Sequence, residues 1–158
     1  MPEGKNKMLV IRKMREEDIK PAAELEARIF PDPWSERAIR ETWEQKQTFI
    51  LTAFEDSKLI GYLILYYVLE EGEIARIAVA PEYRCMGVGS RMLLEMEILC
   101  ENDGISKLLL DVRESNEKAR SFYEEHGFLI DGIRRNFYDD PVEDAILMSC
   151  AFKNKPAS

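Results

Sequence analysis

Two closely spaced glycines mark the part of the chain where residue type and spacing point most directly to chemistry. Gly87 and Gly89 follow the apolar run Ile77–Val79 and precede a segment with helical spacing of apolar residues. Glycine has no Cβ, so backbone N–H groups can approach an anion closely, and the start of the following helix adds unpaired donors and a positive dipole end. The pattern predicts a phosphate or pyrophosphate site, although a glycine-rich turn without a ligand would show the same spacing.

The spacing disfavours two common nucleotide sites. A dinucleotide fingerprint requires a third glycine three residues after the second, and that position is Met92. A Walker loop requires Gly-Lys-Ser or Gly-Lys-Thr, which is absent here. Neither NAD nor ATP is therefore the expected ligand.

Composition limits the class of protein. The chain has 158 residues, of which 46% are hydrophobic and 33% charged, which is typical of one ordered globular domain. The net charge of −8 argues against a nucleic-acid partner and is compatible with a basic peptide, although solubility alone would explain it. Three cysteines and one histidine support neither a disulfide framework nor a metal site.

No segment predicts a membrane or export signal. The first seven residues lack the apolar core of a signal peptide, and the longest apolar stretch, Leu59–Leu69, is too short for a transmembrane helix. We expect a cytoplasmic protein without membrane association. Residues 1–7 and 154–158 are expected to be polar tails around a single domain that spans residues 8–153.

The elements that must position these residues follow from periodicity and turn signals. The expected helices are Glu16–Phe30, Ser35–Gln47, Gly87–Glu101 and Asn116–His126. Ser35 and Asn116 are the expected N-caps, Gly127 is an expected C-cap, and a kink or restart is expected at Pro21. The expected strands are Leu9–Arg12, Phe49–Phe54, Leu59–Leu69, Glu73–Val79, Lys107–Val112, Phe128–Tyr138 and Val142–Phe152. This order predicts an α/β fold: a single mixed, mostly antiparallel sheet flanked by helices, with a central parallel βα crossover. A ligand should bind beyond the carboxyl end of the strand Glu73–Val79.

Two motifs in this order resemble the GNAT acetyltransferase superfamily. Arg84-x-x-Gly87-x-Gly89 at a strand-to-helix turn is similar to its motif A, and Asn116 with the segment Ser121–Phe128 is similar to its motif B. The resemblance implies the GNAT fold, acetyl-CoA as co-substrate, no metal, and direct attack of an amine on the thioester.

Further segments narrow the resemblance to the RimI-type ribosomal-protein-alanine N-acetyltransferases, over nearly the whole chain after the first residues. They are Pro33–Ser35, Ile77–Val79, Leu110–Asn116, Arg134–Tyr138 and Glu143–Met148. This resemblance implies a protein N-terminus as substrate, with the N-terminal alanine of a ribosomal protein as the expected acceptor.

The resemblance also implies the binding residues. Those expected to contact acetyl-CoA are Ile77, Ala78, Val79, Arg84, Cys85, Met86, Gly87, Val88, Gly89, Ser90, Asn116 and Tyr123. Those expected to line the peptide groove are Pro33, Trp34 and Tyr138. Trp34 would alternatively be a hydrophobic staple at the start of a helix.

The resemblance places Tyr123 as the general acid, and a phenol can protonate the departing thiolate. Its alternative is a packed helix aromatic. Asp111 occupies the position of the family's glutamate base but is one methylene shorter, so a water relay is an option; its alternative is an ion pair with Arg113 or Arg135. Glu73 is the second candidate base, or an ordinary charge in a strand. The single histidine, His126, next to a helix C-terminus, is expected to be structural.

The acceptor amine can be argued from its pKa. An N-terminal amine has a pKa of about 7.7–8, so its deprotonation near pH 7 costs roughly 1 kcal/mol, against roughly 4–5 kcal/mol for a lysine at about 10.4. An N-terminal acceptor therefore needs only a weak base. The alternatives are a GNAT enzyme acting on a lysine side chain or a small-molecule amine, and a non-catalytic acyl-CoA-binding module.

Overall fold

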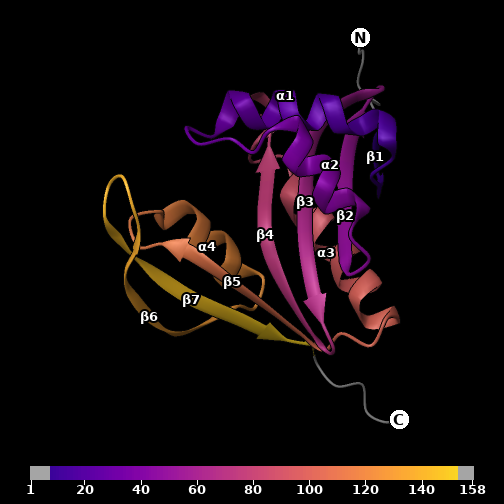
Figure 1. The fold of residues 1–158 in the computed structure, drawn as a ribbon. Coiled ribbons are helices and arrows are strands. Elements are labelled where there is room, and N and C mark those ends of the chain that lie inside the picture. The colour runs from indigo at the N-terminus through magenta and orange to yellow at the C-terminus, as the bar shows by residue number, and fades with distance from the viewer. Residues whose placement is uncertain (1–7, 153–158) are drawn as a thin grey trace. The chain divides into compact units, whose positions relative to one another are not determined.

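A computed structural model describes residues 8–152, and the predicted tails, residues 1–7 and 154–158, lie outside this range. One seven-stranded sheet has the order β1-β2-β3-β4-β5-β7-β6. The elements are β1 (Leu9–Lys13), η1 (Glu16–Asp18), α1 (Ile19–Ile29), α2 (Glu36–Glu44), β2 (Thr48–Glu55), β3 (Lys58–Val68), β4 (Glu71–Val79), η2 (Pro81–Tyr83), α3 (Val88–Asn102), β5 (Lys107–Arg113), α4 (Glu117–Glu125), β6 (Leu129–Tyr138) and β7 (Glu143–Ala151) (Figure 1). The predicted mixed, mostly antiparallel sheet with one parallel β4–β5 pair is confirmed.

The chain divides into two compact units. Within the described residues, the first unit comprises residues 8–66 and 75–99, and the second comprises residues 67–74 and 100–152. Strand β4 contributes its first residues to the second unit and its last residues to the first.

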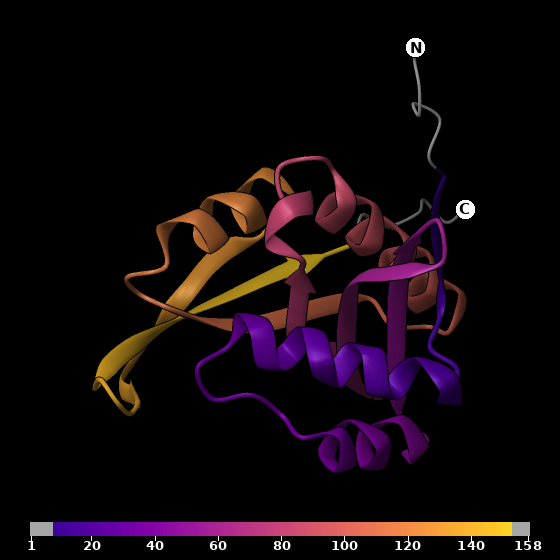
Figure 2. The ribbon, with the colours of Figure 1, turned by 90° about the horizontal axis from the view of Figure 1, so that it is seen from above.

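The first unit packs helices on both faces of the antiparallel strands β1, β2 and β3. Helices α1 and α2 lie on one face and α3 lies on the other (Figure 2). Ile19 of α1, Ile39 of α2, Leu63 of β3 and Met92 of α3 have no exposed surface. These side chains come from the apolar faces that the periodicity predicts.

Two helix boundaries in this unit follow from local chemistry. The predicted restart near Pro21 is present, because a 3₁₀ turn over Glu16–Asp18 gives way to α1 at Ile19. Ser35 is the N-cap of α2, and its Oγ accepts a hydrogen bond from Ala38 N at 3.0 Å. Helix α2 ends at Glu44, earlier than predicted, because Gln45 is extended and Thr48 Oγ1 donates to carbonyls of the last turn.

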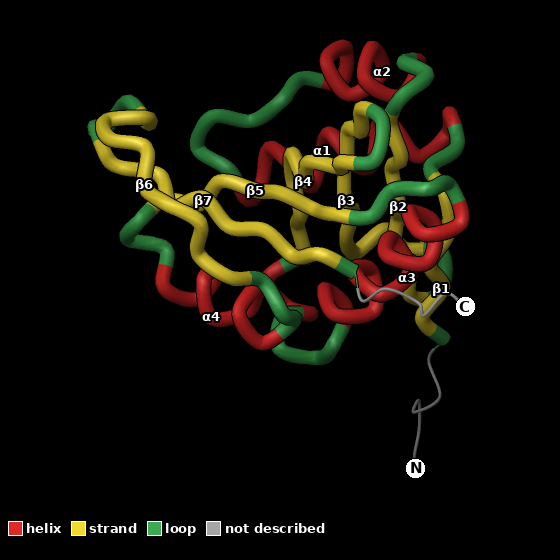
Figure 3. The backbone as a smooth tube through the Cα atoms, turned by 90° about the horizontal axis from the view of Figure 1, so that it is seen from below, coloured by secondary structure: helices red, strands yellow, loops and turns green. Residues whose placement is uncertain are grey.

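The second unit combines the start of β4 with β5, β7, β6 and α4, and Figure 3 shows α4 along one face of β5, β7 and β6. Its core contains Leu108 and Leu110 of β5, Phe128, and Met148 of β7. As predicted, Asn116 caps α4, with its side chain accepting from Ala119 N at 3.1 Å. None of the helices in residues 8–152 has the length and apolar character needed to cross a bilayer.

Candidate active site

The segment from the end of β4 to the start of α3 forms a strand–loop–helix turn within the first unit. Cys85 and Gly87 both have positive φ, 63° and 85°. Arg91 N donates to Gly87 O at 3.0 Å, which closes the first turn of α3, so the N–H groups of Val88, Gly89 and Ser90 have no acceptor within the helix. A Cβ built on Gly87 meets no atom within 4 Å. The turn therefore offers open space beside a helix N-terminus, as an anion site requires.

Side chains before this turn fix the approach of the backbone. Arg84 Nε donates to Val79 O at 3.0 Å. Arg28 of α1 donates to Glu82 at 2.9 Å, and this hydrogen bond holds the pKa of the Glu82 carboxyl below its usual value. These hydrogen bonds fix the backbone as far as Arg84, whereas the next two residues, Cys85 and Met86, are exposed.

The structure brings ten of the predicted cofactor residues into this one segment. Ile77, Ala78 and Val79 end β4, and Ala78 is buried. Residues 84–87 form the loop, and residues 88–90 form the first turn of α3. Asn116 and Tyr123 belong to the second unit.

A groove within the first unit lies between the α1–α2 loop, defined as Phe30–Ser35, the helix α2, and β3. It is lined by Pro33, Trp34, Ser35, Ala38, Glu41, Thr42, Gln45 and Tyr66. Thr42 Oγ1 and Tyr66 OH lie 3.2 Å apart and share a hydrogen bond. Two of the residues predicted to bind the peptide, Pro33 and Trp34, therefore line this groove, and the third, Tyr138, lies in the second unit.

Sequence reasoning missed a buried polar group beside this groove. Glu26 of α1 has no exposed surface and accepts hydrogen bonds from Tyr62 OH and from the guanidinium of Arg76. The one available signal is that Glu26 lies among the apolar positions of α1, next to the buried Leu25 and four residues after the buried Ala22. A carboxylate in such a place needs buried partners, but nothing in the sequence says which residues supply them.

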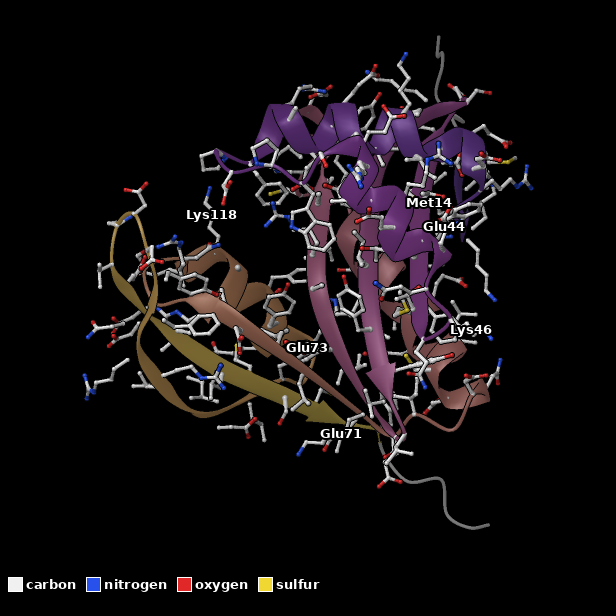
Figure 4. All side chains as sticks on the ribbon, viewed as in Figure 1. Met14, Glu44, Lys46, Glu71, Glu73 and Lys118 are labelled. Atoms are coloured by element: carbon white, nitrogen blue, oxygen red, sulfur yellow. The ribbon has the colours of Figure 1, made fainter. Side chains whose placement is uncertain are left out.

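The two candidate bases lie on one face of the second unit's strands. Glu73 of β4 pairs with Leu109 of β5, and Asp111 follows two residues later on β5, so their side chains share a face. The opposite face of β5 carries buried residues, among them Leu110. Asp111 is half-buried, whereas Glu73, labelled in Figure 4, is exposed.

The ion pairs considered for Asp111 do not form. Arg113 pairs with Glu143 at 3.0 Å, and Arg135 pairs with Asp144 at 3.6 Å. Each arginine thus binds a carboxylate of β7, and neither forms an ion pair with Asp111.

Tyr123, the predicted acid, lies in the core of the second unit with 6% of its surface exposed. Its ring makes edge contacts with Phe122 and Phe128, with centroids 5.3 and 5.4 Å apart. Burial, with a smaller effect of Tyr138, raises the pKa of Tyr123 above its usual value. The phenol therefore remains protonated throughout the physiological pH range.

Tyr138 affects the pKa of Tyr123, and its own pKa is affected by Asp111. Burial raises the pKa of Tyr138, and the nearby Asp111 carboxylate raises it further. The guanidinium of Arg113 lies 4.4 Å from the centre of the Tyr138 ring and partly offsets this effect. The second unit thus gathers three of the predicted side chains, Asp111, Tyr123 and Tyr138.

The histidine has the structural environment that the sequence predicts. His126 Nδ1 donates to Phe122 O at 2.8 Å, and its ring lies 4.5 Å from that of Phe122. This bond caps the C-terminal turn of α4 and orients the imidazole toward its own helix.

Known proteins match most of this chain. Residues 19–128 match the acetyltransferase (GNAT) family. The ribosomal protein bS18-alanine N-acetyltransferase of Escherichia coli (strain K12) is 35% identical over 145 residues, which cover 90% of this chain and 97% of that protein. The crystal structure of the ribosomal-protein-S18-alanine N-acetyltransferase from Escherichia coli has a TM-score of 0.87 and 31% identity, covering 96% and 98% of the two chains. The PaiA N-acetyltransferase of Thermoplasma acidophilum, solved in complex with coenzyme A, has a TM-score of 0.72 and 26% identity, covering 92% and 99%.

Proposed function

Because this chain belongs to the GNAT acetyltransferase family, we propose that it transfers the acetyl group of acetyl-CoA to the α-amino group of a protein N-terminus in the cytoplasm. The acceptor is the N-terminal alanine of a ribosomal protein. The observation that carries this proposal is the similarity, over nearly their full lengths, to a relative named for acetylating the alanine of bS18. The open turn at Gly87 supports the acetyl-CoA part of the proposal independently.

The turn before α3 is the proposed pyrophosphate site. The unpaired N–H groups of residues 88–90 and the positive end of the α3 dipole favour an anion there. Gly87 supports this use because its positive φ and the empty space around its Cβ position let an anion approach the backbone. Ile77 and Val79, just before the turn, are the proposed contacts of the pantetheine arm, and Asn116 the proposed contact near the thioester.

The proposed reaction is a direct transfer between the two bound substrates. The neutral amine nitrogen attacks the thioester carbonyl carbon, a C–N bond forms, and the C–S bond breaks. The amine loses one proton to the base, and the thiolate gains one from the Tyr123 hydroxyl. The raised pKa of Tyr123 keeps its proton in place at every working pH, but it also makes the phenol a weaker acid. The proton is therefore transferred only as negative charge develops on sulfur, and water then returns a proton to the phenolate.

Asp111 is the proposed base, with Glu73 as the second choice. Two observations support Asp111: its carboxylate is not paired with Arg113 or Arg135, and it interacts electrostatically with Tyr138. Its short side chain is compatible with a relay through one water. A weak base suffices, since deprotonating an N-terminal amine near pH 7 costs only about 1 kcal/mol.

The groove beside the α1–α2 loop is the proposed acceptor site. Trp34 and Pro33 supply apolar surface, and the exposed carboxylate of Glu41, which pairs with Arg37 at 3.1 Å, adds a polar edge to the groove. Tyr138 is the proposed peptide contact in the second unit. A basic protein such as a ribosomal protein fits a chain with a net charge of −8.

A peptide panel tests the proposal. Thiol release from acetyl-CoA is followed with peptides that begin with alanine, with other first residues, and with an acetylated first residue. We expect turnover with free alanine N-termini and none with the blocked versions. Equal turnover on blocked peptides that contain lysine would overturn the N-terminal assignment, and binding of acetyl-CoA without any turnover would indicate a binding module.

A further inference from the structure

The buried carboxylate of Glu26 joins three elements of the first unit to the α1–α2 loop. Its Oε1 accepts from Tyr62 OH of β3, and its Oε2 accepts from both Nε and Nη2 of Arg76 of β4. Oε2 also accepts from the backbone N–H of Trp34 at 3.0 Å. One fully buried side chain thus receives donors from two strands and from the loop.

Arg76 contacts the same loop at three further points. Its Nη2 donates to Asp32 O at 3.3 Å. Its guanidinium lies 3.7 Å from the centre of the Phe30 ring and 5.6 Å from that of Trp34. The flat, delocalised guanidinium can stack on aromatic rings and donate in its own plane at the same time, which a lysine ammonium cannot do.

The Glu26–Arg76 pair contacts the α1–α2 loop as well as the core. A buried ion pair is weak support for stability, because desolvation of both charges offsets most of their attraction. Here the pair binds backbone groups of a loop, Asp32 O and Trp34 N–H, and that loop forms one wall of the proposed acceptor groove. The interactions therefore select one conformation of the loop.

We propose that Arg76 and Glu26 are positioning residues that hold Pro33 and Trp34 in the conformation that receives the acceptor peptide. This inference rests on the proposed function, because it assigns the groove to the peptide. Arg76 acts through the loop and touches no reacting atom. Loss of the paired guanidinium donors of Arg76 weakens peptide binding and leaves acetyl-CoA binding and the chemical step intact.

Arg76→Lys is the test, with Tyr62→Phe as the matched control. Lysine keeps a positive charge beside Glu26, but it has one nitrogen in place of Nε and Nη2 and no planar group. It therefore cannot hold Glu26 and Asp32 O while also stacking on the Phe30 ring. Phenylalanine removes one hydrogen bond from the same carboxylate but leaves every contact with the loop. We expect Arg76→Lys to raise the peptide KM about tenfold or more, because misplaced binding groups weaken productive binding. Its kcat and acetyl-CoA KM should stay within about twofold of wild type. Tyr62→Phe should lower the melting temperature and leave the peptide KM unchanged.

Hydrogen exchange at the Trp34 amide gives a readout that does not depend on activity. We expect exchange in the segment 30–36 to accelerate in Arg76→Lys and to remain unchanged in Tyr62→Phe. If wild type acetylates no peptide but the exchange difference appears, the proposed function fails while the positioning role stands. Unchanged exchange and an unchanged peptide KM in Arg76→Lys would overturn the positioning role, as would an equal rise in KM in both variants.

A second variant covers the case in which Arg76→Lys does not fold. The double variant Glu26→Gln/Arg76→Met removes both charges together and leaves no uncompensated buried ion. We expect it to fold and to show the same selective rise in peptide KM. A wild-type peptide KM in this variant would contradict the inference.

Discussion

Replacing Gly87 by alanine separates the backbone strain of the turn from its role in binding. Gly87 has a φ of 85°, and a Cβ at this position meets no atom within 4 Å. The substitution therefore costs no steric overlap in the free protein. It costs only the strain of a left-handed L-residue, about 1–2 kcal/mol, which corresponds to roughly 2–8 °C in melting temperature at this chain length.

Bound acetyl-CoA changes this balance, since the proposed pyrophosphate site uses the open space at Gly87. A methyl group there displaces the anion from at least one backbone N–H. A hydrogen bond to a charged group contributes about 1.5–3 kcal/mol, so the Kd for CoA should rise by roughly 10- to 150-fold. Isothermal titration calorimetry with CoA measures this change, and thermal unfolding without ligand measures the strain.

Gly104→Ala is the matched control. Gly104 follows the end of α3, has a φ of 82°, and likewise has no atom within 4 Å of an added Cβ. The two alanine variants should lose similar stability, and only Gly87→Ala should lose affinity for CoA. Equal CoA affinity in both variants would refute the assignment of the turn before α3 as the pyrophosphate site.

Three further predictions concern proton transfer. Tyr123→Phe should lower kcat about 100-fold with little change in acetyl-CoA affinity, and a near-wild-type kcat in steady-state assays would assign the proton donor to solvent. Asp111→Asn should lower kcat/KM for the peptide about 100-fold while Glu73→Gln stays within about twofold, and the reverse result would make Glu73 the base. The kcat/KM of wild type should rise with pH up to the amine pKa of about 8. Because the pKa of Tyr123 is raised, ionisation of its phenol should cause no loss of activity below pH 10. A loss of activity at alkaline pH that is present in wild type and absent in Tyr123→Phe would contradict this prediction.

The order of helices and strands was predictable because local patterns determine it. Apolar periodicity identifies α3 and β5, and side-chain chemistry identifies the caps at Ser35 and Asn116. The glycine spacing before α3 likewise predicts a strand-to-helix turn there, and Gly87 within that turn has a positive φ. These features depend on residues within a few positions of one another.

The polar pairings were not predictable, because they join residues far apart in the sequence. Glu26 meets Arg76 across 50 positions and Tyr62 across 36. Arg113, considered as a partner of Asp111, binds Glu143 of β7 instead, 30 positions away. A sequence shows that a carboxylate on an apolar helix face needs a partner, but several arginines satisfy that need equally well until the strand register is known.

The most direct test of the central claim uses one peptide that carries both possible acceptors. A peptide with a free N-terminal alanine and an internal lysine is incubated with the enzyme and acetyl-CoA, and tandem mass spectrometry locates the acetyl group over the initial phase of the reaction. The α-amino group should be acetylated at least tenfold faster than the lysine, given the difference of about 3–4 kcal/mol in the cost of deprotonation. Preferential acetylation of the lysine would contradict the assignment of this chain as an N-terminal acetyltransferase.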